Sequence, residues 1–185
     1  MKKRKTRAAS LVLALAMTTG LLAGCSQSSG GSSDTGEQRD DIIIATANET
    51  PSLSPAEHNA VAGSYMNLLT YNTLFRTGMD LEPEPDLVES YENVSETQWN
   101  FTIKQGVKFH DGTEMTVEDV KASLEWAKTF PEVSLYNNDI VSVDIVDDTT
   151  VQITTDGPDA MLLNNLCHHG NAIVPKALID AGHDF

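Results

Sequence analysis

Residues 99–127 are WNFTIKQGVKFHDGTEMTVEDVKASLEWA, and they contain the clearest structural signals of the sequence. Its first part alternates apolar and polar residues, which predicts a strand with one buried face, carried by Trp99, Phe101 and Ile103. Asp111-Gly112 then predicts a turn, and Thr116 with Asp119 three residues later predicts a capped helix start. The helix that follows has one apolar face: Val117, Val120, Leu124 and Ala127. The stretch therefore predicts a strand, a tight corner and a helix.

The corner also contains the pair His110 and Asp111, which has the residue types of a general acid and base. Adjacent residues on a strand point to opposite faces, however. In addition, no serine or cysteine stands at a spacing from this pair that is typical of a catalytic nucleophile. Acidic residues after the turn are favoured where a helix begins. We therefore interpret the pair as structural, and we predict no catalytic residues.

Outside this stretch, apolar runs and turn signals predict alternating strands and helices. Residues 42–47 predict a buried strand, because the run is apolar and β-branched. Residues 57–71 predict a helix with the apolar face Val61, Tyr65, Leu68 and Leu69. Residues 81–86 contain two prolines and predict an irregular surface loop.

The second half of the chain predicts a hairpin followed by short helices. Residues 140–146 and 151–155 are β-rich and flank a polar loop. Met161, Leu162 and Leu166 predict a short helix, residues 172–174 a short extended run, and residues 175–181 a helix opened by proline. Strands and helices interleave around a hairpin, so the sequence predicts a mixed α/β fold.

The N-terminus predicts export from the cytoplasm. Five basic residues precede the apolar run 8–22, which is too short and too polar for a membrane-spanning helix and is typical of a signal peptide. Leu22-Ala23-Gly24-Cys25 resembles the lipobox of bacterial lipoproteins. We expect residues 1–24 to be removed, Cys25 to carry lipid, and residues 25–41 to be a flexible tether of serine, glycine and acidic side chains.

The charge of the chain excludes one class of partner. The formal net charge is −15, and loss of the five basic residues of the leader makes it more negative still. So acidic a protein is not expected to bind nucleic acid or to adhere to anionic lipid by charge. Only two cysteines are present, and lipidation of Cys25 leaves Cys167 without a partner.

One further cluster, Cys167-His168-His169, contains side chains that suit zinc or nickel. Neighbouring residues rarely converge on one ion, and metal ligands are usually separated by two or more residues. We therefore favour a loop that closes the short helix before Asn171, and we expect no metal and no cofactor.

Several segments, taken in order, resemble one protein family. The matching pieces are PSLSP (51–55), LLTYNTLFR (68–76), LEPEPDLVESYE (81–92), the stretch 99–127, DIVSVDIVDDTTVQITT (139–155) and NAIVPKALIDAG (171–182). Together they are similar to the first part of extracytoplasmic solute-binding proteins, family 5. This family serves ABC importers of oligopeptides, dipeptides and nickel.

The resemblance implies a fold and a function. Residues 42–185 would be part of the first lobe of a two-lobed periplasmic-binding-protein-like (type II) fold, with the second lobe and the chain's return missing. We would expect a monomeric, lipid-anchored, extracytoplasmic protein that captures peptides for an ABC permease and ATPase complex. A signal-peptide receptor or a nickel-complex binder of the same fold stays open, and so does an extracellular hydrolase that uses His110.

The resemblance also implies where the ligand binds. By position in the family pattern, Asn59 and Val61 would line the cleft and Tyr136 would face the ligand. Tyrosine suits this role because it joins a broad apolar ring to one hydrogen-bonding tip. Each residue also has a structural alternative: Asn59 near a helix start, Val61 on the apolar stripe of the helix, and Tyr136 as an exposed loop residue.

Overall fold

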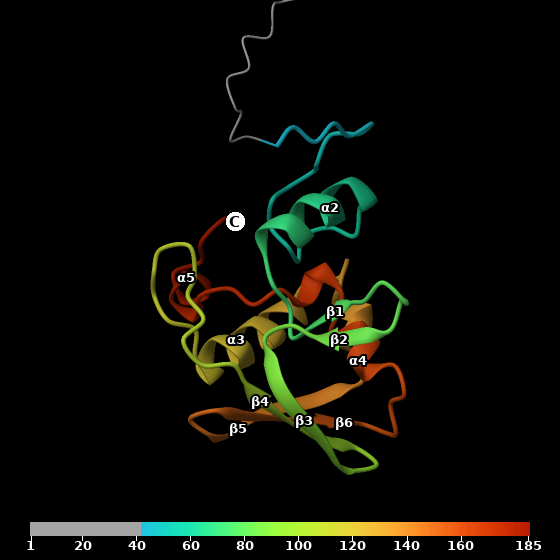
Figure 1. Ribbon diagram of the computed structural model, residues 1–185, viewed down its shortest axis with the longest axis vertical. Coiled ribbons are helices and arrows are strands. Elements are labelled where there is room, and N and C mark those ends of the chain that lie inside the picture. The colour runs from blue at the N-terminus through green and yellow to red at the C-terminus, as the bar shows by residue number, and fades with distance from the viewer. Residues whose placement is uncertain (1–41) are drawn as a thin grey trace, which may run out of the picture. The chain divides into compact units, whose positions relative to one another are not determined.

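The strand, turn and helix predicted around Asp111 are all present in the computed structural model, which describes residues 42–185 (Figure 1). β4 (Gln98–Ile103) buries Phe101 and Ile103, and α3 (Val117–Ala127) begins at the predicted cap. The Asp119 carboxylate accepts hydrogen bonds from the Thr116 amide and hydroxyl, both at 2.8 Å. These contacts satisfy a free donor at the helix start.

The strands form a four-stranded antiparallel sheet in the order β3-β4-β6-β5. β3 (Val88–Ser95) lies at one edge, and β5 (Ile140–Asp147) lies at the other. β5 and β6 (Thr150–Thr155) are the predicted hairpin. In its loop, the Asp147 carboxylate accepts a hydrogen bond from the Thr149 amide at 2.9 Å, which holds the turn.

Helices cover the sheet and bury its apolar face. α3 packs against β5 and β6 and also contacts α5 (Lys176–Asp180), while α4 (Leu162–Asn165) contacts the short strand β1 (Phe75–Thr77) (Figure 1). The predicted short helices near residues 162 and 176 are thereby confirmed. The largest fully buried side chains come from both helices and strands and from the residues beside them: Phe75, Phe101, Leu74, Ile103, Leu124, Ile153, Leu162 and Leu166.

The expectation of an irregular loop at residues 81–86 is wrong. Residues Pro83–Pro85 form β2, which pairs antiparallel with β1 in a separate two-stranded sheet. An edge strand tolerates proline where the missing amide would face away from its partner. The Arg76 guanidinium also donates to the Glu84 carboxylate at 2.7 Å across the two strands.

The buried strand expected at residues 42–47 is also not observed. This run has no strand pairing, and the side chain of Ile42 is 89% exposed. A β-branched apolar run favours extended backbone, but a strand needs a neighbour to satisfy its amides and carbonyls. None of the strands between residues 42 and 185 supplies that neighbour. Residues 1–41, with the predicted leader, Cys25 and the tether, lie outside the described part of the chain.

The predicted helix at residues 57–71 is present as α2 (Val61–Thr70), but its buried face is not the apolar one. Val61, Tyr65, Leu68 and Leu69 are all more than half exposed. Gly63 and Asn67 are the buried residues of α2 instead. The helix packs against the rest of the compact unit Ala45–Phe185 through a small residue and a polar one. The spacing of apolar residues does not predict such a contact face.

Two short 3₁₀ turns complete the fold: η1 (Ser134–Tyr136) after α3, and η2 (His169–Asn171) before α5. η2 contacts α2. The predicted mixed α/β arrangement is observed. Across residues 42–185, every helix is too short or too polar to cross a membrane.

Candidate functional site

Asn59 lies in the loop that leads into α2, and a buried histidine fixes this loop. The His58 ring accepts a hydrogen bond from the Ala60 amide at Nδ1 (3.3 Å), and its Nε2 lies 3.1 Å from the Ser52 carbonyl. The ring lies directly over Gly63, where a Cβ would come within 1.9 Å of His58 Cε1. The absence of a side chain at residue 63 therefore lets α2 and the Asn59 loop approach closely.

Tyr136 meets Asn59 although the two residues are 77 positions apart in the chain. Asn59 Nδ2 donates to Tyr136 Oη at 3.3 Å. Tyr136 ends η1, which follows α3 through a tight turn in which the Ser134 amide donates to the Phe130 carbonyl at 2.9 Å. The structure therefore brings together two of the three predicted ligand residues.

His168 is the third member of this group. Its ring stacks on the Tyr136 ring, with centroids 3.7 Å apart and planes at 17°, and its Nε2 lies 3.2 Å from Asn59 Oδ1. We call these three residues, Asn59, Tyr136 and His168, the Asn59 cluster. From the sequence, His168 stands out only as part of a metal motif, because no local pattern connects it to residues 32 and 109 positions away.

Val61 does not join the Asn59 cluster by any contact in the structure. It is the first residue of α2, and its side chain is 67% exposed. Its predicted contact with a ligand stays a prediction, and its alternative role on a buried stripe is wrong.

The three side chains of the motif Cys167-His168-His169 contact three different partners. Cys167 Sγ donates to the Leu163 carbonyl at 3.3 Å, and burial raises the pKa of this thiol. His168 turns to Asn59, and His169 Nδ1 lies 3.1 Å from the Pro55 carbonyl. The same nitrogen also lies 3.4 Å from Asn67 Nδ2. The described residues contain no group of three side chains placed to hold a metal ion.

His110 and Asp111 form the predicted corner between strand and helix. The Asp111 carboxylate accepts from the Thr113 amide (2.9 Å) and hydroxyl (2.6 Å), and these bonds lower the pKa of Asp111. Gly112 has φ +87°, a conformation that favours glycine. His110 and Asp111 are both exposed, and the carboxylate is engaged by the turn rather than by the imidazole.

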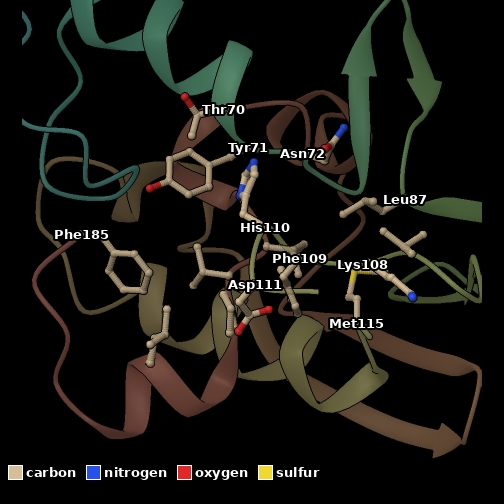
Figure 2. Close-up of a pocket in the computed structure, with 15 residues that line it drawn as sticks. Thr70, Tyr71, Asn72, Leu87, Lys108, Phe109, His110, Asp111, Met115 and Phe185 are labelled. Atoms are coloured by element: carbon tan, nitrogen blue, oxygen red, sulfur yellow. The ribbon is translucent and has the colours of Figure 1, made fainter. Parts of the chain in front are cut away.

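A pocket of about 290 Å³ lies beside this corner. Figure 2 shows that its walls come from the end of α2 (Thr70), from residues 107–111 and from the C-terminal Phe185. Its lining includes buried core side chains such as Leu87 and Met115. Asn59, Val61 and Tyr136 are not among the residues that line it. The hydrogen-bonding groups of the Asn59 cluster come together elsewhere, from three segments of the chain.

Acidification is expected to destabilise the fold through His168. Burial, and secondarily the neighbouring His169, lower the pKa of His168 from 6.5 to about 3. Below pH 6.5, His168 therefore binds a proton in the unfolded chain, whereas in the folded chain it stays neutral down to about pH 3. The contribution of neutral His168 to the stability of the fold is complete above pH 6.5 and is lost as the pH falls from 6.5 towards 3. Thermal unfolding should show a drop in Tm between about pH 7 and pH 5.

A His168→Gln variant should show a smaller drop in Tm over the same range, because one of the neutral histidines is gone. The matched control is His110→Gln, which removes an exposed histidine and should keep the full drop. An equal drop in wild type and His168→Gln would contradict the assignment.

Comparison with known proteins places the chain in a family. A sequence model described as "Bacterial extracellular solute-binding proteins, family 5 Middle" matches residues 82–184. The glutathione-binding protein GsiB of Escherichia coli K12 is 28% identical over 175 residues, which are 91% of this chain and 32% of GsiB. The chain thus spans about a third of the length of the curated relatives that it matches.

Solved structures agree with this match. The PBP AgaA from A. tumefaciens R10, in complex with agropinic acid, is 29% identical with a TM-score of 0.67, covering 72% of this chain and 28% of AgaA. NikZ from Campylobacter jejuni, in complex with Ni(L-His), is 27% identical with a TM-score of 0.62, covering 72% of this chain and 27% of NikZ. The described residues therefore form part of the periplasmic-binding-protein fold. Because the family model matches more than half of the chain, the protein belongs to the bacterial extracellular solute-binding proteins, family 5.

Proposed function

We propose that the chain is part of the substrate-binding lipoprotein of an ABC importer, and that it captures peptides outside the cytoplasmic membrane. The observation that carries this proposal is the Asn59 cluster, in which three distant segments bring hydrogen-bonding groups together. Family membership supports the importer role. The family consists of binding proteins, so the alternative of a hydrolase that uses His110 is abandoned.

Within this proposal, Asn59, Val61 and Tyr136 contact the ligand. The Asn59 amide and the Tyr136 hydroxyl hydrogen-bond polar groups of the peptide backbone, while the Tyr136 ring and the exposed Val61 side chain offer apolar surface. Capture is reversible: two lobes close by hinge motion around the ligand, which is then delivered to the permease and ATPase complex. The ligand undergoes no reaction.

The proposal includes an anchor. Residues 1–24 would direct export, Cys25 would carry lipid, and residues 25–41 would tether a monomeric binding domain to the membrane surface. Cell fractionation tests this part, because a Cys25→Ser variant should move from the membrane fraction to the soluble extracytoplasmic fraction. An unchanged distribution would contradict lipidation at Cys25.

A nickel complex is the second candidate ligand, because NikZ, at 27% identity, is described with bound Ni(L-His). The Asn59 cluster supports the peptide more directly. Its polar groups are an amide, a phenol and an imidazole whose two nitrogens are already engaged within the fold. Such groups hydrogen-bond well but leave no free imidazole for a metal.

Calorimetry would decide between these ligands, using the protein in the full length that its gene encodes. Tri-alanine, reduced glutathione and the nickel complex of L-histidine are each titrated into the purified protein. We expect heat of binding with tri-alanine, and an Asn59→Ala variant should bind it about 3- to 10-fold more weakly through loss of one or two hydrogen bonds. The matched control is Asn138→Ala, which removes an exposed amide close to Tyr136 in sequence and should change nothing. Binding of the nickel complex alone would favour the second candidate.

A further inference from the structure

The donor and the acceptor of each hydrogen bond in the Asn59 cluster can be assigned, starting from a backbone amide. The Gly170 amide lies 3.0 Å from His168 Nδ1. A backbone N–H can only donate, so Nδ1 is the unprotonated nitrogen of the ring. In a neutral imidazole the other nitrogen then carries the proton. His168 Nε2 therefore donates to Asn59 Oδ1, which lies 3.2 Å away.

The direction continues through Asn59 to Tyr136. Because Oδ1 receives the proton of His168, the amide of Asn59 must turn its Nδ2 to the other side. Nδ2 donates to Tyr136 Oη at 3.3 Å. This is the single hydrogen bond of Tyr136 Oη within residues 42–185, and in it the phenol oxygen accepts. The hydroxyl proton of Tyr136 is thereby left for a partner outside the cluster.

Packing keeps this arrangement in place. The rings of Tyr136 and His168 are stacked, and a Cβ at Gly170 would lie 2.6 Å from Val133 Cγ1, a side chain that is fully buried. Residue 170 must therefore remain glycine for its amide to approach the ring so closely. Burial also keeps His168 neutral, with its pKa at about 3. The direction of the bonds is thus unchanged at neutral pH.

We infer that the relay formed by Gly170, His168, Asn59 and Tyr136 makes the Tyr136 hydroxyl a hydrogen-bond donor to the ligand, so that this part of the site takes an acceptor oxygen. The inference rests on the proposed binding function. His168 is a positioning residue in this scheme: it does not touch the ligand but sets which atom of Asn59 faces Tyr136. The acceptor is a carbonyl oxygen of a peptide backbone, or the carboxylate at the end of the peptide.

The first test needs no ligand. Nitrogen NMR of the protein labelled with ¹⁵N-histidine reports which ring nitrogen of His168 carries the proton, with His168→Gln used to assign the signal. We expect the proton on Nε2 at neutral pH. A proton on Nδ1 would overturn the relay, whatever the protein binds.

The second test is a double-mutant cycle on the affinity for tri-alanine. Asn59→Asp is nearly isosteric, but its carboxylate accepts from both neighbours, so the Tyr136 hydroxyl turns inward and offers the ligand only lone pairs. Tyr136→Phe removes the hydroxyl and retains the ring. Each change should weaken binding about 3- to 10-fold, and Asn59→Asp should weaken it less in the Tyr136→Phe background than in wild type, because only the direct contact of Asn59 with the ligand is then affected.

Asn138→Asp is the matched control for charge, because it places the same carboxylate at a neighbouring exposed position. It should leave the affinity unchanged. If Asn59→Asp weakens binding as much in the Tyr136→Phe background as in wild type, the Tyr136 hydroxyl is not the group that the relay orients, and the inference is overturned.

One further experiment identifies which oxygen of the peptide is the acceptor, and the ¹⁵N measurement separates failure of the relay from failure of the proposed function. If the acceptor is a backbone carbonyl, tri-alanine with an amidated C-terminus should show the same loss on Tyr136→Phe. If the loss disappears with the amidated peptide, the acceptor is the terminal carboxylate. Absence of any binding by the wild-type protein would contradict the peptide ligand named in the proposed function, and the ¹⁵N measurement would still decide the relay.

Discussion

Replacing Phe101 with alanine should lower the free energy of unfolding by about 3–5 kcal/mol. Phe101 is fully buried on β4, an inner strand of the sheet. Its ring meets Phe75 edge to face, with centroids 5.8 Å apart, and stacks against Trp99 at 6.4 Å. Alanine would remove these contacts and leave a cavity that neighbouring strands cannot close.

Urea unfolding followed by circular dichroism measures this loss as a shift of the transition midpoint. Because small domains are stable by only about 5–15 kcal/mol, a loss of this size removes much of the total stability. The matched control is Val94→Ala on β3, where the side chain is about half exposed and the expected change is within about 0.5 kcal/mol. Similar losses in the two variants would show that the sheet core is not where the structure places it.

Replacing Gly63 with alanine should destabilise the fold and displace the Asn59 loop. In an ordinary helix interior, alanine is more stable than glycine by about 1 kcal/mol. Here the new Cβ would lie 1.9 Å from His58 Cε1. The ring cannot move aside without losing its contacts with the Ala60 amide and the Ser52 carbonyl. Overpacking costs about 1–3 kcal/mol and outweighs the gain in helix propensity.

Thermal unfolding of Gly63→Ala tests the expected loss, and the affinity for tri-alanine tests the displacement of Asn59. The matched control is Gly157→Ala, because a Cβ at residue 157 meets no atom within 4 Å. We expect the control to keep both its stability and its affinity. A stabilised Gly63→Ala variant would mean that helix propensity outweighs the contact with His58.

The sequence correctly predicts structural features that depend on residues close together in the chain. The β4 alternation of Phe101 and Ile103, the Asp111-Gly112 turn and the Asp119 cap each involve residues no more than a few positions apart. The β5–β6 hairpin belongs to the same class, because its strands are joined by a short loop. Such features follow from periodicity and hydrogen-bonding side chains alone.

Predictions fail where a distant partner decides the outcome. Residues 42–47 have the composition of a strand but no neighbouring strand among the described residues. The apolar residues of α2 are exposed, because the helix packs through Gly63 and Asn67. The prolines at 83 and 85 are accepted in β2 because that strand pairs with β1 on one side only.

The mixed α/β class, the strand, corner and helix of residues 99–127, and the resemblance to a family of solute-binding proteins all follow from the amino-acid sequence. The meeting of His168 with Asn59 and Tyr136, and the direction of their hydrogen bonds, become visible only in the folded protein. The two sets of features differ in the separation of the interacting residues along the chain. Turns and caps are set by neighbours within a few residues, whereas the Asn59 cluster forms only after packing has brought three distant segments into contact.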